Sequence, residues 1–131
     1  MVINYQKIYE KLGYLFYAIA AADQHVKFSE EKKLRELVTQ KWVPLENSTD
    51  EFNTDAAYYI SIAFDYLLAE GVSAEEAFRV FQEYYTEHKS AFDQNLKKQI
   101  TATAQAIAQA FARKNQQEQK LLAELSRLLK T

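Results

Sequence analysis

The chain has no cysteine, two glycines and one proline among its 131 residues. The lack of cysteine excludes disulfide bonds, thiolate chemistry and cysteine-ligated metal sites, including structural zinc of the usual kind. The two glycines are isolated, which excludes a glycine-rich loop of the type that binds phosphate groups. Because so few residues interrupt a helix and strand patterns are lacking, the sequence predicts an all-α protein.

Long hydrophobic runs are also scarce. The longest one extends from Leu12 to Ala22, ends at Asp23 and is too short to cross a bilayer. No basic segment followed by a small-residue cleavage site marks a signal peptide. The length and the nearly half hydrophobic composition fit a single domain, residues 1–131, with one core. We therefore expect a cytoplasmic protein without a transmembrane segment.

Apolar residues recur at helical spacing in six segments. The expected helices cover about 4–22, 29–43, 54–70, 74–88, 93–111 and 116–129. Capping residues precede several of them, and Gly71 is placed to end the third. In that helix we expect Ile60, Ala63 and Leu67 to form the buried stripe, with Tyr59 and Tyr66 widening it. Short connections between these helices predict a compact antiparallel bundle.

Few side chains are placed for catalysis. The only histidines, His25 and His88, lack the spacing that would bring two imidazoles to one helical face, so we expect both at the surface. Asp65 is either an exposed acid, the simpler interpretation, or a buried acid paired with a basic group. In the adjacent pairs Tyr58/Tyr59 and Tyr84/Tyr85, one tyrosine of each should lie nearer the surface. Nothing here predicts an enzyme.

Charge is unevenly distributed along the chain. Residues 46–87 carry ten acidic and one basic side chain, whereas residues 97–131 carry seven basic and two acidic ones. Solvated helix surfaces or contacts within the fold explain this distribution most simply, and steering of a charged partner is the alternative. The basic residues form no dense patch, so nucleic-acid binding is not expected.

The turn between the first two helices combines several oxygen ligands. Asp23 ends an alanine-rich helical run, and Glu30 and Glu31 begin the next helix. These three carboxylates supply part of the coordination shell of a hard divalent cation, and the acidic segment 46–55 offers further ligands. Alternatively, Asp23 forms the turn locally, while Glu30 and Glu31 interact with the positive end of the second helix.

The segment 18–37, with Asp23, Val26 and Glu30, resembles the TerB-like family of tellurite-resistance proteins. In that family the segment reads roughly Ala-Asp-Gly-x-(Ile/Val)-x-x-x-x-Glu, and Gln24 stands here in place of the glycine. The resemblance implies a bundle with two related helical halves and a role in tellurite or general stress response. It also implies a divalent cation such as calcium or magnesium, for which Asp23, Glu30 and Glu31 are the candidate ligands.

Two functions remain open on the sequence. The first is a stress-response module that binds a divalent cation at Asp23, Glu30 and Glu31. The second is a metal-independent helical module that binds a protein partner of unknown identity, in a membrane-associated or stress complex, through exposed aromatic side chains and its acidic face. Separately, the sequence leaves homodimerisation through an aromatic face open. Converging carboxylates in the turn would favour the first function, and carboxylates that point apart would favour the second.

Overall fold

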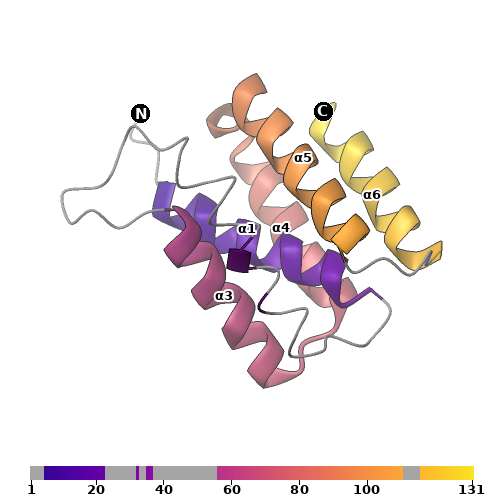
Figure 1. Cartoon of the computed structure of the whole chain (residues 1–131). Coiled ribbons are helices and arrows are strands. Elements are labelled where there is room, and N and C mark those ends of the chain that lie inside the picture. Colours follow the sequence, from indigo (N-terminus) through magenta and orange to yellow (C-terminus); the bar gives the residue numbers. More distant parts are fainter. Residues whose placement is uncertain (1–4, 23–31, 33–34, 37–55, 111–115) are drawn as a thin grey trace.

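The structure is a computed structural model that describes residues 5–22, 32, 35–36, 56–110 and 116–131. These residues include α1 (Tyr5–Ala20), α3 (Ala56–Glu70), α4 (Ala74–Glu87), the 3-10 helix η2 (Lys89–Ala91), α5 (Gln94–Ala110) and α6 (Gln116–Leu129). The described part of the chain has five α-helices in a compact bundle and no strand, which confirms the predicted all-α class (Figure 1). We expected six helices. The remaining one, over residues 29–43, lies mostly outside the described residues, but Lys32, Arg35 and Glu36 are described and are helical.

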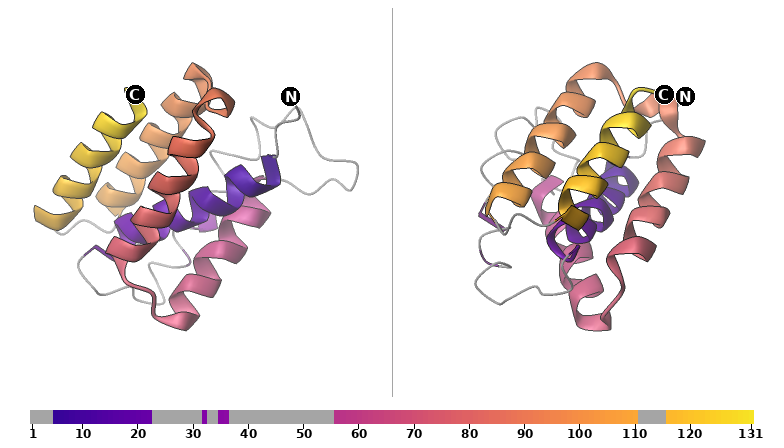
Figure 2. Two further views of the ribbon diagram at one scale, coloured as in Figure 1. Left: turned by 180° about the vertical axis from the view of Figure 1, so that it is seen from behind. Right: turned by 90° about the vertical axis from the view of Figure 1, so that its right-hand side faces the viewer.

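Helix α1 is the central element of the bundle. It packs against α3, α4, α5 and α6, and Figures 1 and 2 show α3 on one side of it and α6 on the other. Every side chain from Leu15 to Ala22 is buried. The second half of this helix is therefore covered on all sides. Such complete burial is tolerated because the only polar side-chain group in this segment, the hydroxyl of Tyr17, has a hydrogen-bond partner.

Two contacts of Tyr17 in α1 hold α3 and the residues after it against α1. The hydroxyl of Tyr17 donates a hydrogen bond to the carbonyl oxygen of Val72, just after α3, at 2.6 Å. The ring of Tyr17 also packs edge-on against Phe64, with centroids 5.5 Å apart. Gly71 has a φ of +66°, which confirms its predicted role as the left-handed residue that ends α3.

Side-chain caps define where α4 and α5 begin. Ser73 Oγ accepts a hydrogen bond from the amide of Glu76 at 3.2 Å, so Ser73 caps the start of α4. The carboxylate of Glu76 lies 3.6 Å from Arg79 on the next turn. Asp93 Oδ1 accepts from the amide of Leu96 at 2.8 Å, so α5 begins at the residue after Asp93. Helices α5 and α6 then run antiparallel beside each other (Figure 2).

Aromatic side chains fill the corner between α4 and α5. Tyr85 is fully buried, packs edge-on against Phe92 at 4.9 Å and stacks on Phe81 at 6.4 Å. Tyr84 is only half-buried and stacks on the exposed His88 at 4.1 Å. The pair Tyr84/Tyr85 thus divides between surface and core as predicted. None of the described helices combines the length and the apolar character needed to cross a bilayer.

Candidate functional site

The predicted cation ligands Asp23, Glu30 and Glu31 lie outside the described residues, so their convergence stays a prediction. The acidic segment 46–55 that we offered as a source of further ligands also lies outside them. Within the described ranges, no group of three or more His, Asp or Glu side chains is arranged to hold a metal ion.

One ion pair connects the predicted second helix to α3. Arg35 donates from its guanidinium to Asp65 Oδ2, and both side chains are partly exposed. Asp65 Oδ1 is buried and has no hydrogen-bond partner within the described part of the chain. We expected either an exposed acid or a buried acid paired with a basic group. Asp65 is a half-exposed acid that is paired with a basic group, so each interpretation is correct in part. The pair places the helical residue Arg35 beside the middle of α3.

Helix α3 exposes three large hydrophobic side chains at intervals of one helical turn. Tyr58, Ile62 and Tyr66 are 57%, 49% and 56% exposed, whereas most large apolar side chains in the described part are buried. Residues spaced by four lie on one helical face, so these three form a continuous stripe, called the α3 stripe below. Tyr59 is half-buried, so the prediction that one member of the pair Tyr58/Tyr59 lies near the surface is confirmed.

The exposure of Tyr66 corrects one prediction, because we expected this side chain to widen the buried face of α3. Its neighbour across the helix boundary is Tyr14 of α1, which is half-buried. Burial raises the pKa of Tyr14, and the charges of Glu10 and Tyr66 raise it further. The amino group of Lys11 lies 4.8 Å from the centre of the Tyr14 ring. Tyr14 of α1 is therefore close enough to the Tyr66 end of the α3 stripe for the two side chains to interact electrostatically.

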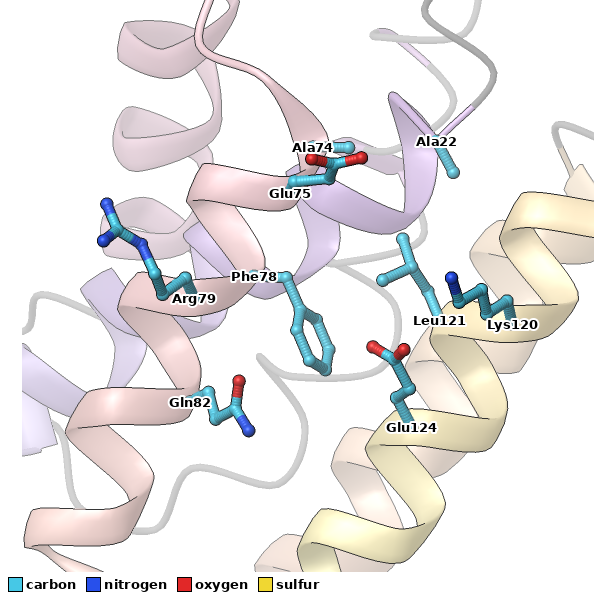
Figure 3. Close-up of a pocket in the computed structure, with 9 residues that line it drawn as sticks. All are labelled: Ala22, Ala74, Glu75, Phe78, Arg79, Gln82, Lys120, Leu121 and Glu124. Carbon is cyan, nitrogen blue, oxygen red and sulfur yellow. The ribbon is translucent and has the colours of Figure 1, made fainter.

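A second surface feature is a groove between α4 and α6 (Figure 3). One cavity of about 390 Å³ occupies its first part and is lined by Ala22, Ala74, Glu75, Phe78, Arg79, Gln82, Lys120, Leu121 and Glu124. A second cavity of about 310 Å³ is lined by Phe78, Gln82, Glu124, Arg127, Leu128 and Thr131. Because the two share three lining residues, they form one elongated depression, called the α4–α6 groove below.

Charged side chains stand around an apolar floor in this groove. Figure 3 shows the ring of Phe78 and the side chain of Leu121 between the two helices, with the carboxylate of Glu124 directed toward Phe78. Arg79 points away from the groove and lies 3.6 Å from Glu76. Within the described part of the chain, Glu75, Lys120 and Glu124 form no ion pair.

The two surfaces differ in chemistry. The α3 stripe offers aromatic and aliphatic area, and the groove offers an apolar floor with separated charges. The one buried hydroxyl without a partner in the described residues, that of Tyr85, lies within the aromatic corner, with Lys97 Nζ 5.8 Å from its ring centre. Sequence reasoning missed the groove because its walls are separated by some forty residues. The helical spacing of Tyr58, Ile62 and Tyr66 was the available signal for the stripe.

Comparisons of the chain with protein-family models, with curated proteins and with solved structures gave no match. The resemblance to the TerB-like family therefore stays a prediction that rests on the residues of segment 18–37.

Proposed function

We propose that the protein is a helical interaction module that acts by binding rather than by catalysis, with the α3 stripe as its contact surface. The observation that carries the proposal is the alignment of Tyr58, Ile62 and Tyr66, each about half exposed, on one face of α3. Aromatic residues are enriched at protein interfaces because they combine large apolar area with few rotatable bonds. Contiguous exposed apolar surface of this kind marks interaction sites in soluble proteins.

The occupant that we assign to the α3 stripe is the α3 stripe of a second copy. The stripe has the same residue types read in either direction, with tyrosine one turn before and one turn after Ile62. A two-fold axis through Ile62 therefore places Tyr58 of one copy against Tyr66 of the other, as an isologous interface requires. Asp65 lies beside the stripe, and its carboxylate is paired with the guanidinium of Arg35. The interface would therefore not bring an unpaired negative charge against the second copy.

The size of the stripe sets the strength of this association. Full burial of an aromatic side chain removes about 150–250 Å² from water. Three half-exposed side chains thus contribute roughly 300 Å² per copy, and stable interfaces bury about 1,200–2,000 Å² in total. We expect a weak, concentration-dependent dimer, with Tyr14 adding to the contact.

Sedimentation equilibrium over a wide range of protein concentration tests the proposal. The chain should show a reversible monomer–dimer equilibrium, and Ile62→Lys should shift it to monomer. Gln105→Lys, which makes the same charge change at an exposed position of α5, is the matched control and should dimerise like the unmodified chain. A monomer at every concentration would overturn the proposal.

Cation binding in a TerB-like stress-response role is the second candidate function. Its support is the resemblance of segment 18–37, together with the helical state of Lys32, Arg35 and Glu36, which fits the predicted helix after the turn. In this proposal Asp23, Glu30 and Glu31 bind calcium or magnesium, and ion binding changes the position of the second helix relative to α3. The Arg35–Asp65 pair lies at that contact.

A further inference from the structure

The α4–α6 groove lies between the acidic and the basic parts of the sequence. Helix α4 belongs to segment 46–87, with ten acidic residues and one basic, and α6 belongs to segment 97–131, with seven basic and two acidic. Glu75 stands on the α4 wall, and Lys120 and Arg127 stand on the α6 wall, with Glu124 between them. Arg79 also lines the α4 wall, but its side chain points away from the groove and pairs with Glu76. Glu75 is therefore the charge that the α4 wall directs at the groove, whereas on the α6 wall two basic side chains outnumber the single acidic one.

The dimensions of the groove suit a short helix. Its α4 wall extends from Ala74 to Gln82 and its α6 wall from Lys120 to Thr131. At a rise of 1.5 Å per residue these walls are roughly 12 and 16 Å long, which corresponds to two or three turns of an α-helix. Phe78, Leu121 and Leu128 give the depression an apolar floor along this length. Amphipathic helices bind other proteins by laying an apolar face into such a groove.

We propose that the α4–α6 groove binds a short amphipathic helix of a partner protein. The apolar stripe of that helix lies on Phe78, Leu121 and Leu128. Its basic edge faces Glu75 on α4, and its acidic edge faces Lys120 and Arg127 on α6. Nucleic acid does not fit this groove, because the carboxylate on the α4 wall would face a phosphate backbone.

This site is separate from the α3 stripe. Helix α3 lies on the opposite side of α1 from α6 in Figure 1 and in the left view of Figure 2. Ile62 lines neither cavity of the groove. Peptide binding in the groove therefore does not depend on self-association through α3, and Ile62→Lys should leave it unchanged.

Three stapled helical peptides provide the probe. They share one leucine stripe and differ only in the two edges beside it: lysine on one edge and glutamate on the other, lysine on both, or glutamate on both. Reversing a helix in the groove exchanges its edges, so the mixed peptide can match the two walls in one of its two orientations. Fluorescence anisotropy with the full chain should give the tightest binding for the mixed peptide, because each uniform peptide meets one wall of like charge.

Charge reversal in the groove gives the decisive comparison. Glu75→Lys should make the glutamate-only peptide the preferred one, and Lys120→Glu should favour the lysine-only peptide. We expect changes of about three- to tenfold in relative affinity, as for one or two exposed ion pairs. Glu83→Lys, at an exposed position of α4 that does not line the groove, is the matched control and should keep the original ranking.

The proposal is overturned by three results. One is equal affinity for the three peptides. Another is a ranking that neither Glu75→Lys nor Lys120→Glu changes although circular dichroism shows both variants folded. The last is no measurable binding of any peptide to the unmodified chain. Because Ile62→Lys is tested beside them, a failure of the groove is distinguishable from a failure of the α3 stripe.

Discussion

Gly13 of α1 lies so close to Ala63 of α3 that a methyl group on Gly13 would come within 2.5 Å of the Ala63 Cβ. The same methyl group would lie 2.7 Å from the carbonyl oxygen of Ile60. Only a residue without a side chain allows the two helices to approach this closely. The pair therefore sets the distance between α3 and the central helix, and with it the position of the α3 stripe.

We predict that Gly13→Ala destabilises the protein by about 1–3 kcal/mol, the usual range for a side chain forced into a packed contact. Alanine is otherwise the better helix former, by roughly 0.5–1 kcal/mol, so the sign of the change is diagnostic. Urea unfolding followed by circular dichroism measures it. The double variant Gly13→Ala/Ala63→Gly should recover part of the loss, since the Ile60 carbonyl remains. A more stable Gly13→Ala protein would contradict this contact.

The Arg35–Asp65 pair should contribute modestly to stability. Its side chains are 51% and 39% exposed, so a double-mutant cycle with Arg35→Ala and Asp65→Ala should give a coupling energy of about 0.2–1 kcal/mol. Salt should weaken that coupling, because exposed charges are screened. A coupling of zero at low salt would contradict the prediction that this pair stabilises the fold.

Alkaline pH should destabilise the fold through its tyrosines. Burial raises the pKa of Tyr17 above its ordinary value of 10.0, and burial is also the main cause that raises the pKa of Tyr14 and Tyr84. The folded state therefore holds these phenol protons more tightly than the unfolded state does. The contribution of these tyrosines to the free energy of unfolding should be constant below pH 10. It should fall as the pH rises above 10, because the unfolded state then loses its phenol protons first.

Urea unfolding at several pH values tests the role of Tyr17. Tyr17→Phe removes the hydroxyl and its 2.6 Å hydrogen bond to Val72, which should cost about 1 kcal/mol at neutral pH. Above pH 10 the variant should lose stability less steeply than the unmodified protein. The matched control is Tyr58→Phe, which removes the hydroxyl of an exposed tyrosine. An unchanged alkaline slope in Tyr17→Phe would show that Tyr17 is not responsible.

Calorimetric titration with calcium and magnesium tests the predicted cation site. If Asp23, Glu30 and Glu31 ligate the ion, the metal-stripped protein should bind it saturably, and Asp23→Asn should weaken binding about tenfold or more, because a charged ligand is lost. Asp93→Asn changes a carboxylate that caps α5 and serves as the control. Absence of heat and of thermal stabilisation with both ions would leave Asp23 as a turn-forming residue.

The sequence predicted the helices well where a local side chain defines their ends. The role of Gly71 was predicted from the sequence, since it acts through its own backbone angle. Ser73 and Asp93 act as locally, because each accepts a hydrogen bond from an amide three residues along the chain. The exposure of Tyr66 was mispredicted because α3 carries apolar side chains on nearly every face. Periodicity correctly placed Ile60, Ala63 and Leu67 on the buried face, but it could not determine how far that face extends around the helix. The close approach of Gly13 to Ala63, fifty residues away in the chain, is a feature of packing that the pattern of α3 does not contain.

The candidate sites were harder to predict than the helices. The α4–α6 groove depends on how two helices separated in the chain both pack on α1, which no local pattern encodes. The charge asymmetry between segments 46–87 and 97–131 was visible in the sequence, but the relative position of the two segments was not. The candidate cation ligands Asp23, Glu30 and Glu31 are close together in the sequence. The site could therefore be predicted without knowing how the helices pack.

Disulfide crosslinking tests the pairing of two α3 stripes most directly, since the chain has no native cysteine. A two-fold axis through residue 62 brings the two copies of this residue together, so Ile62→Cys should form a covalent dimer readily under mild oxidation. Ala69→Cys lies on the same exposed face but seven residues from the axis, which separates its two copies by roughly 21 Å along the helices. Disulfides require Cα atoms within about 7 Å. Rapid crosslinking of Ile62→Cys and slow crosslinking of Ala69→Cys is the predicted result, and equal rates for the two variants would contradict the account.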